Sequence, residues 1–173
     1  SFIPPLLKKG YKIYLATQPA NLENLTISED LRPYIQFFNC LLEENKNWYR
    51  NRITSLNIAV FGPLGMPTEA WIDHHFGIVC GITLGFLDQA GEPITMVRAC
   101  RHFEGDTTQM WTFLVDPRYR NQGLGKNTLA LLCGFSQNQE KITFTTQLNS
   151  SSIAAYLHLT NKNEPLKLDA IGF

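Results

Sequence analysis

The sequence lacks both a membrane-spanning stretch and an excess of one charge. No run approaches the ~20 consecutive apolar residues that a transmembrane helix needs, and no segment has the layout of a signal peptide. Fifteen Lys and Arg residues balance fifteen Asp and Glu residues. Nothing therefore indicates a membrane or a nucleic acid as partner. We expect a soluble, cytoplasmic protein.

Cysteines are few and far apart, and none forms a C-x-x-C pair. We expect free, buried thiols in a reducing compartment at Cys40, Cys80, Cys100 and Cys133. No further ligands stand at zinc-like spacing around the adjacent His74 and His75, so no metal site is predicted. A hydrolase built on Cys80 or Cys100 with a nearby histidine stays open, because nothing in the sequence brings such residues together.

The composition is that of a folded protein. At 173 residues the chain is the size of one domain, which we place at 1–173, and it is long enough to bury an ordinary core. Hydrophobic residues make up 44% and charged residues 17%, which argues against disorder. Internal repeats are absent, so the chemistry must be sought in local motifs.

One strand-to-helix junction carries the most informative of these motifs. The apolar run Trp111–Val115 predicts a buried strand, and Asp116 and Pro117 end it because proline has no backbone N–H to donate. An R-x-x-G-x-G loop follows, formed by Arg120, Gly123 and Gly125. A helix is predicted directly after it, over Lys126–Phe135.

A helix that starts after glycines is a binding site for an anion. The first helical N–H groups have no partner within the helix, and the aligned peptide dipoles place partial positive charge there. Gly123 and Gly125 let a phosphate approach the backbone without a Cβ in the way. A plain glycine-rich turn is the alternative reading.

Two other phosphate-binding loops do not match. A Walker A loop needs glycine where Arg120 stands and Ser or Thr where Asn127 stands. A dinucleotide-binding loop needs its third glycine at Thr128.

A second motif follows one predicted strand later. After the strand Ile142–Leu148 comes Asn149-Ser-Ser-Ser-Ile-Ala154-Ala-Tyr156. Together with the R-x-x-G-x-G loop and the strand ending Val115-Asp116-Pro117, this resembles the GNAT superfamily of acyl-CoA N-acyltransferases. The resemblance covers about Lys12 to Tyr156.

Hydrophobic periodicity places the remaining elements. An aromatic stripe after a Thr26–Glu29 capping box predicts a first helix over Ser28–Glu44, and a second helix is predicted over Asn47–Leu56. We interpret Ile58–Trp71, rich in glycine and proline, as a substrate loop. Strands are predicted at Lys12–Ala16, Phe76–Leu87, Pro93–Phe103 and Thr107–Val115, the second and third joined by a hairpin turn at Asp88–Glu92.

The resemblance implies an α/β fold with a mixed, mostly antiparallel sheet flanked by helices. The expected order is β-α-α-β-β-β-α-β-α-β. The family normally adds two strands after the Tyr156 helix, but only Leu166–Phe173 remains here. We therefore expect the C-terminal strand region to be incomplete.

The same resemblance implies roles for individual residues. The backbone amides of Phe113, Leu114 and Val115 would pair with the pantetheine arm of CoA, which Asn149 would also bind. The Tyr156 hydroxyl would protonate the departing thiolate as general acid. The pyrophosphate would be held by Arg120 and by the backbone amides of Asn121, Gln122, Gly123, Leu124, Gly125 and Lys126.

The family does not specify the general base. The polar residues near predicted strand ends are Glu104, His102, His74 and His75. We favour Glu104, because a carboxylate at a strand end can take the proton of an ammonium group through water. For the histidine pair, an exposed loop is the favoured reading over catalysis.

The function that follows is transfer of an acetyl group from acetyl-CoA to a primary amine of a small molecule, protein or peptide, directly within a ternary complex. No metal is expected, and a homodimer is left open. The alternatives are a non-catalytic acyl-CoA-binding or protein-interaction module, and a toxin-like acetyltransferase of aminoacyl-tRNA. A neutral chain supports the last poorly.

Overall fold

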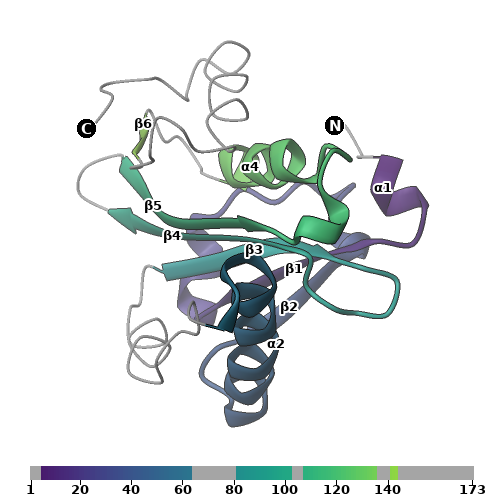
Figure 1. Cartoon of the computed structure of the whole chain (residues 1–173). Helices are drawn as coiled ribbons and strands as arrows, with labels where there is room; N and C mark the ends of the chain where they lie inside the picture. Colours follow the sequence, from purple (N-terminus) through teal and green to yellow (C-terminus); the bar gives the residue numbers. More distant parts are fainter. Residues whose placement is uncertain (1–4, 64–80, 103–106, 136–140, 144–173) are drawn as a thin grey trace.

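The computed structural model describes residues 5–63, 81–102, 107–135 and 141–143, which form a twisted sheet with a helix on each face (Figure 1). Within these residues the sheet has six strands, in the order β2-β1-β3-β4-β5-β6. The strands are β1 Lys12–Thr17, β2 Ile35–Asn39, β3 Gly81–Leu87, β4 Thr95–His102, β5 Thr107–Val115 and β6 Lys141–Thr143. The α-helices are α1 Pro5–Lys8, α2 Glu43–Phe61 and α4 Leu124–Phe135, and the 3-10 helices are η1 Pro19–Asn24, η2 Arg32–Tyr34 and η4 Pro117–Tyr119.

The predicted fold class is confirmed. The central strands β1, β3, β4 and β5 pair antiparallel, while β2 and β6 add parallel pairs at the two edges. The hairpin turn between β3 and β4 also forms as predicted, with the N–H of Asp88 donating to the Glu92 carbonyl at 2.8 Å. Gly91 has a φ of 84° in this turn, a conformation that glycine adopts without steric cost.

Strand β5 carries a bulge at Trp111. Thr112 pairs with Arg98 and Met110 with Ala99, so Trp111 is one extra residue opposite a regular stretch of β4. Such a bulge bends the strand and increases its twist. Within the described residues, β6 pairs only with the first three residues of β5, Thr107–Gln109, on the N-terminal side of the bulge.

The two faces of the sheet bury different residues of the same strand. Ile13 and Leu15 of β1 join the core cluster under α4, while Tyr14 and Ala16 join the cluster under α2. This alternation follows from the two-residue period of a strand. Figure 1 shows α4 on one face and α2 on the other. The loop described below leads from β5 into α4.

The predicted helix over Ser28–Glu44 is wrong. The chain forms the short helix η2 and then strand β2, which pairs with β1 in parallel from Ile35 opposite Ile13 to Asn39 opposite Thr17. Pro33 is the physical reason, because proline inside a helix removes a hydrogen bond and disfavours helical backbone in the preceding residue. The backbone of Ile35–Asn39 forms its hydrogen bonds with the edge of β1 instead.

Helix α2 is longer than predicted. It starts at Glu43 and continues to Phe61, so the apolar piece Ile58–Phe61 is the end of a helix and not part of a loop. The helix ends only at Gly62, where φ is 75° and the N–H donates to the Ile58 carbonyl. The remainder of the proposed substrate loop, from residue 64, lies outside the described residues. Among the described residues, no helix is long and apolar enough to cross a membrane.

The expectation of free thiols holds for two of the cysteines and fails for a third. Cys40 and Cys133 are free, and burial raises the pKa of each thiol to about 11. Cys100 on β4 is disulfide-bonded. Spacing along the chain cannot reveal such a bond, because strand pairing brings distant residues together. A hydrolase that uses Cys100 as its nucleophile is therefore disfavoured.

Candidate active site

The predicted loop lies where β5 ends and α4 begins, and Asp116 stabilises its entry. The Asp116 carboxylate, 2% exposed, accepts hydrogen bonds from the backbone N–H, Nε and Nη2 of Arg118 at 2.8–3.2 Å. These bonds start helix η4 and lower the pKa of the Asp116 carboxyl below its usual value. The chain therefore leaves the sheet through a tight, charge-assisted turn.

The loop backbone adopts left-handed conformations at two positions. Asn121 has a φ of 64° and Gly123 a φ of 75°. Asparagine tolerates this region better than most residues, and glycine has no Cβ to oppose it. Both residues are exposed, as is Gln122 between them. The loop thus presents its backbone to the solvent.

The N-terminus of α4 follows directly. Among the described residues, the first amide of this helix with a backbone acceptor is that of Asn127, which donates to the Gly123 carbonyl at 3.0 Å. The N–H groups of Leu124, Gly125 and Lys126 precede it and cannot find partners within the helix. Together with the helix dipole, such N–H groups favour an anion at this end of the helix.

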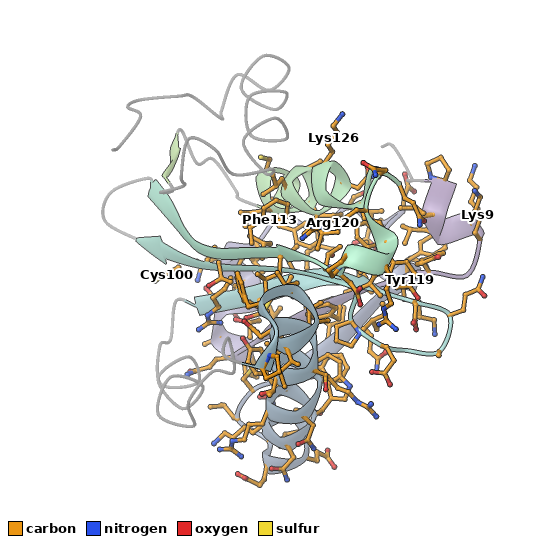
Figure 2. All side chains as sticks on the ribbon, viewed as in Figure 1. Lys9, Cys100, Phe113, Tyr119, Arg120 and Lys126 are labelled. Atoms are coloured by element: carbon orange, nitrogen blue, oxygen red, sulfur yellow. The ribbon has the colours of Figure 1, made fainter. Side chains whose placement is uncertain are left out.

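Gly125 permits α4 to pack closely on β5. A Cβ at this position would lie 3.2 Å from Cζ of Phe113 and 3.3 Å from Cγ2 of Val115. Figure 2 shows Phe113 on β5 beneath the helix. The second glycine of the motif is therefore favoured by close packing, whereas Gly123 is favoured by its backbone conformation.

Two cations flank the loop. Arg120 and Lys126 are exposed, and neither forms a salt bridge with a described residue. Lys126 projects from the outer side of α4 in Figure 2. Arg118, by contrast, is held by Asp116. Positive charge is thus available beside the loop and the N-terminus of α4.

The three expected pantetheine contacts on β5 do not all face the same way. The Asp116 amide donates to the Ile94 carbonyl at 2.8 Å, in register with the β4–β5 pairing. Since consecutive amides of a strand point to opposite edges, the Leu114 amide also points to β4, and those of Phe113 and Val115 point away from it. Only Phe113 and Val115 present amides at the edge of β5 that faces away from β4.

Several predicted site residues lie outside the described residues. They are Glu104, Asn149, Tyr156, His74 and His75. His102 ends strand β4, and its backbone pairs with Thr107. Within the described residues no group of three or more His, Cys, Asp or Glu side chains is arranged to hold a metal ion.

Sequence reasoning missed two buried threonines next to the loop. Thr128 in α4 and Thr95 in β4 are both 0% exposed, and their hydroxyl oxygens lie 2.7 Å apart. The only local signal was a polar residue at position 128, on the otherwise apolar face of the helix that meets the sheet. A packed helix has to satisfy such a group.

Residues 42–159 match the model of the acetyltransferase (GNAT) family. The chain belongs to this family. The match includes the R-x-x-G-x-G loop and the Asn149–Tyr156 motif, so the predicted resemblance is confirmed. No curated protein sequence matches the chain.

Solved structures share the fold at low sequence identity. An aminoglycoside acetyltransferase from an uncultured soil metagenomic sample, in complex with sisomicin, has a TM-score of 0.62 and 11% identity, with 96% of each chain covered. The ribosomal-protein-S18-alanine N-acetyltransferase from Escherichia coli has a TM-score of 0.53 and 17% identity, covering 64% of this chain and 69% of that one. A GNAT-family acetyltransferase from Streptococcus pneumoniae has a TM-score of 0.52 and 15% identity, covering 71% and 86%.

The Asp116 turn has a testable pH dependence. Because the pKa of Asp116 is lowered on folding, its ionised form stabilises the fold above the usual carboxyl pKa of 3.8. That stabilisation is lost as the pH falls below this value through the folded pKa. We expect Asp116→Asn to lower the free energy of unfolding by about 1 kcal/mol at pH 7, because the Arg118 partner is exposed and screened. The difference from the parent should shrink at pH 3.

Urea denaturation at the two pH values measures this difference. Glu29→Gln is the matched control, because Glu29 also pairs with a nearby arginine, Arg32, but is 86% exposed. We expect less than about 0.5 kcal/mol from it. An equal loss at pH 3 and pH 7 in Asp116→Asn would contradict the ionic role of Asp116.

Proposed function

We propose that this chain transfers an acetyl group from acetyl-CoA to a primary amine of a small molecule, protein or peptide. The observation that carries the proposal is the loop at the end of β5. In it, left-handed Asn121 and Gly123 lead into the first N–H groups of α4, which have no partner within the helix, between two exposed cations. In a chain of the acetyltransferase family, this is the expected site of the CoA pyrophosphate.

The chemistry of CoA matches this part of the molecule. Its pyrophosphate accepts hydrogen bonds from the amides of the loop and the first turn of α4, and Arg120 adds charge. The amides of Phe113 and Val115, at the outward edge of β5, hydrogen-bond the amide groups of the pantetheine arm. Asn149 contributes a further hydrogen bond to this arm. The thioester then lies along β5, toward the Trp111 bulge.

The reaction needs an amine without its proton and an acid for the leaving group. The amine nitrogen attacks the thioester carbonyl and forms a C–N bond, and the tetrahedral intermediate collapses with loss of the C–S bond. Glu104 accepts the amine proton through water, and the Tyr156 hydroxyl protonates the thiolate. Holding both reactants together supplies much of the rate enhancement, so no covalent enzyme intermediate is required.

The acceptor is an amine of undetermined class. The structurally similar proteins include an aminoglycoside acetyltransferase and a ribosomal-protein-alanine acetyltransferase. Aminoglycosides and peptide N-termini are therefore sensible acceptors to include. CoA release measured against a panel of aminoglycosides, polyamines, lysine and N-terminal peptides tests the function. CoA binding without turnover across the panel would instead favour a non-catalytic acyl-CoA-binding module.

Gly123 tests the CoA site directly. Gly123→Val places a β-branched side chain at a φ of 75°, which valine adopts only with strain, so the loop must change shape. We expect CoA affinity, measured by calorimetry, to fall by at least about tenfold, the effect of losing one or two hydrogen bonds to a charged group.

Gly62→Val is the matched control for Gly123→Val. Gly62 has the same φ of 75° at the end of α2, and a Cβ at this position would meet no described atom within 4 Å. The control therefore carries similar backbone strain at a site away from the loop, and its CoA affinity should match the parent. Unchanged affinity in Gly123→Val would remove the central claim of this proposal.

Tyr156 is expected to act on the leaving group. If its hydroxyl protonates the thiolate, Tyr156→Phe should lower kcat by about 10²–10⁴-fold and leave CoA affinity nearly unchanged. Steady-state kinetics and calorimetry on the same preparation measure both quantities. Near-normal turnover would assign Tyr156 to packing.

Glu104 is expected to relay the acceptor proton. Amine acceptors are protonated near neutral pH, and a carboxylate also attracts the cation. In Glu104→Gln, kcat/KM should fall by at least about tenfold, and the acidic limb of the pH profile should move or vanish. His102→Ala and His74→Ala should keep that limb. If a histidine variant abolishes it and Glu104→Gln does not, the assignment is wrong.

A further inference from the structure

A chain of four hydrogen-bonding groups runs from the centre of the sheet to the pyrophosphate loop. The Phe86 N–H donates to the Thr95 hydroxyl at 2.9 Å, and the Thr95 and Thr128 hydroxyl oxygens lie 2.7 Å apart. The Thr128 hydroxyl donates to the Leu124 carbonyl at 2.8 Å. This series of hydrogen bonds therefore links β3 and β4 to Leu124, the first residue of α4.

The direction of each hydrogen bond can be assigned. A hydroxyl has one hydrogen, and that of Thr128 is committed to the Leu124 carbonyl, which can only accept. Thr95 must then donate to Thr128, while its own oxygen accepts from Phe86. All donors point the same way, toward Leu124, and such aligned bonds polarise one another.

The last group in this series of hydrogen bonds, the Leu124 carbonyl, fixes the orientation of the Gly125 N–H. The Leu124 carbonyl and the Gly125 N–H belong to one planar, trans peptide unit and point in opposite directions. The Leu124 carbonyl points along α4 toward Thr128, so the Gly125 N–H points back toward the N-terminal end of the helix. This N–H is one of the donors at the start of α4 that have no partner within the helix.

Thr95 is itself held from the other face of the sheet. The Tyr14 hydroxyl donates to the Thr95 carbonyl at 2.7 Å. Tyr14 lies opposite Gly85 in the β1–β3 register, and a Cβ at Gly85 would overlap that carbonyl oxygen. Burial raises the pKa of Tyr14 well above its usual value, so its hydroxyl remains a donor at all working pH values.

We propose that Thr128, supported by Thr95, is a positioning residue that aims the Gly125 N–H at the pyrophosphate of acyl-CoA and strengthens it as a donor. This inference rests on the proposed function and extends it to residues that do not touch the substrate. The position is the one at which a dinucleotide-binding loop keeps its third glycine. Here a hydroxyl takes that place and contacts the sheet.

Thr128→Val tests the proposal, because valine keeps the shape of threonine and replaces its hydroxyl with a methyl group. We expect the Kd for CoA and the KM for acetyl-CoA to rise about tenfold, the effect of weakening one charge-assisted hydrogen bond and leaving the Thr95 hydroxyl without its acceptor. The kcat at saturating acetyl-CoA and the KM for the amine should stay within about twofold, because the reacting atoms are not involved.

Two comparisons separate positioning from general stability. Thr128→Ser keeps the hydroxyl and should bind CoA within about twofold of the parent, whereas Thr128→Ala should bind about tenfold more weakly. These two variants differ by one oxygen atom, and their comparison tests the proposal even if Thr128→Val does not fold. Leu129→Ala removes buried apolar contacts of α4 at the next residue, which is 4% exposed, and should destabilise the protein without raising the Kd to the same extent.

The outcomes are distinct from those of the proposed function. If the parent chain does not bind CoA, the proposed function itself fails. If the parent binds and Thr128→Val binds equally well, only the positioning role is overturned. An equal rise in Kd for Leu129→Ala and Thr128→Val, or a fall in kcat with unchanged KM, would also overturn it.

Discussion

The close contact between α4 and β5 is the constraint on which the site depends. At Gly125 a Cβ would lie 3.2 Å from Cζ of Phe113 and 3.3 Å from Cγ2 of Val115, so glycine lets the helix start near the sheet without displacing these side chains. The contact brings the end of β5 and the N-terminus of α4 together. Gly123 serves a different purpose, since its positive φ turns the chain into the helix. The two glycines of the motif thus have different roles: Gly125 allows close packing and Gly123 allows a positive φ.

Buried threonines attach both helices to the sheet. On the α2 face, the Thr83 hydroxyl oxygen accepts from Nη1 of Arg98 and lies 3.0 Å from the Tyr49 hydroxyl. Arg98 is 3% exposed, and burial lowers its pKa from the usual value. On the α4 face, Thr95 makes the corresponding link through Thr128. Buried hydrogen bonds of this kind fix the position of a helix on the sheet more strictly than apolar contacts do, because a buried hydroxyl without a partner is costly.

Membership of the acetyltransferase family and the geometry of the loop support the same chemistry. The family match covers both motifs, and the fold agrees with solved acetyltransferases. At identities of 11–17%, this likeness concerns the fold and does not extend to the acceptor. The described part of the candidate site is the loop proposed to bind the donor, whose phosphates and amide groups need a generic set of hydrogen bonds. Acceptor recognition depends on other side chains.

Local signals in the sequence determined much of the fold and of the loop proposed to bind CoA. Strands β3, β4 and β5, the Asp88–Glu92 turn and the loop into α4 follow from runs of apolar residues, from glycine and from proline. These features act over a few residues. The predicted helix over Ser28–Glu44 failed although Pro33 argued against it, because an apolar stripe at helical spacing can also supply both faces of an edge strand, as Ile35 and Phe38 do.

Tertiary structure alone decided which polar groups meet. Thr95 and Thr128 are 33 residues apart in the chain, and no local pattern relates them. Their contact exists because Gly125 lets α4 approach the sheet and because strand pairing places β4 beneath the helix. The orientation of the Phe113, Leu114 and Val115 amides likewise depends on the β4–β5 register. A sequence specifies such contacts only through the packing of the whole domain, since hydrogen bonds between distant residues form where packing brings them within reach.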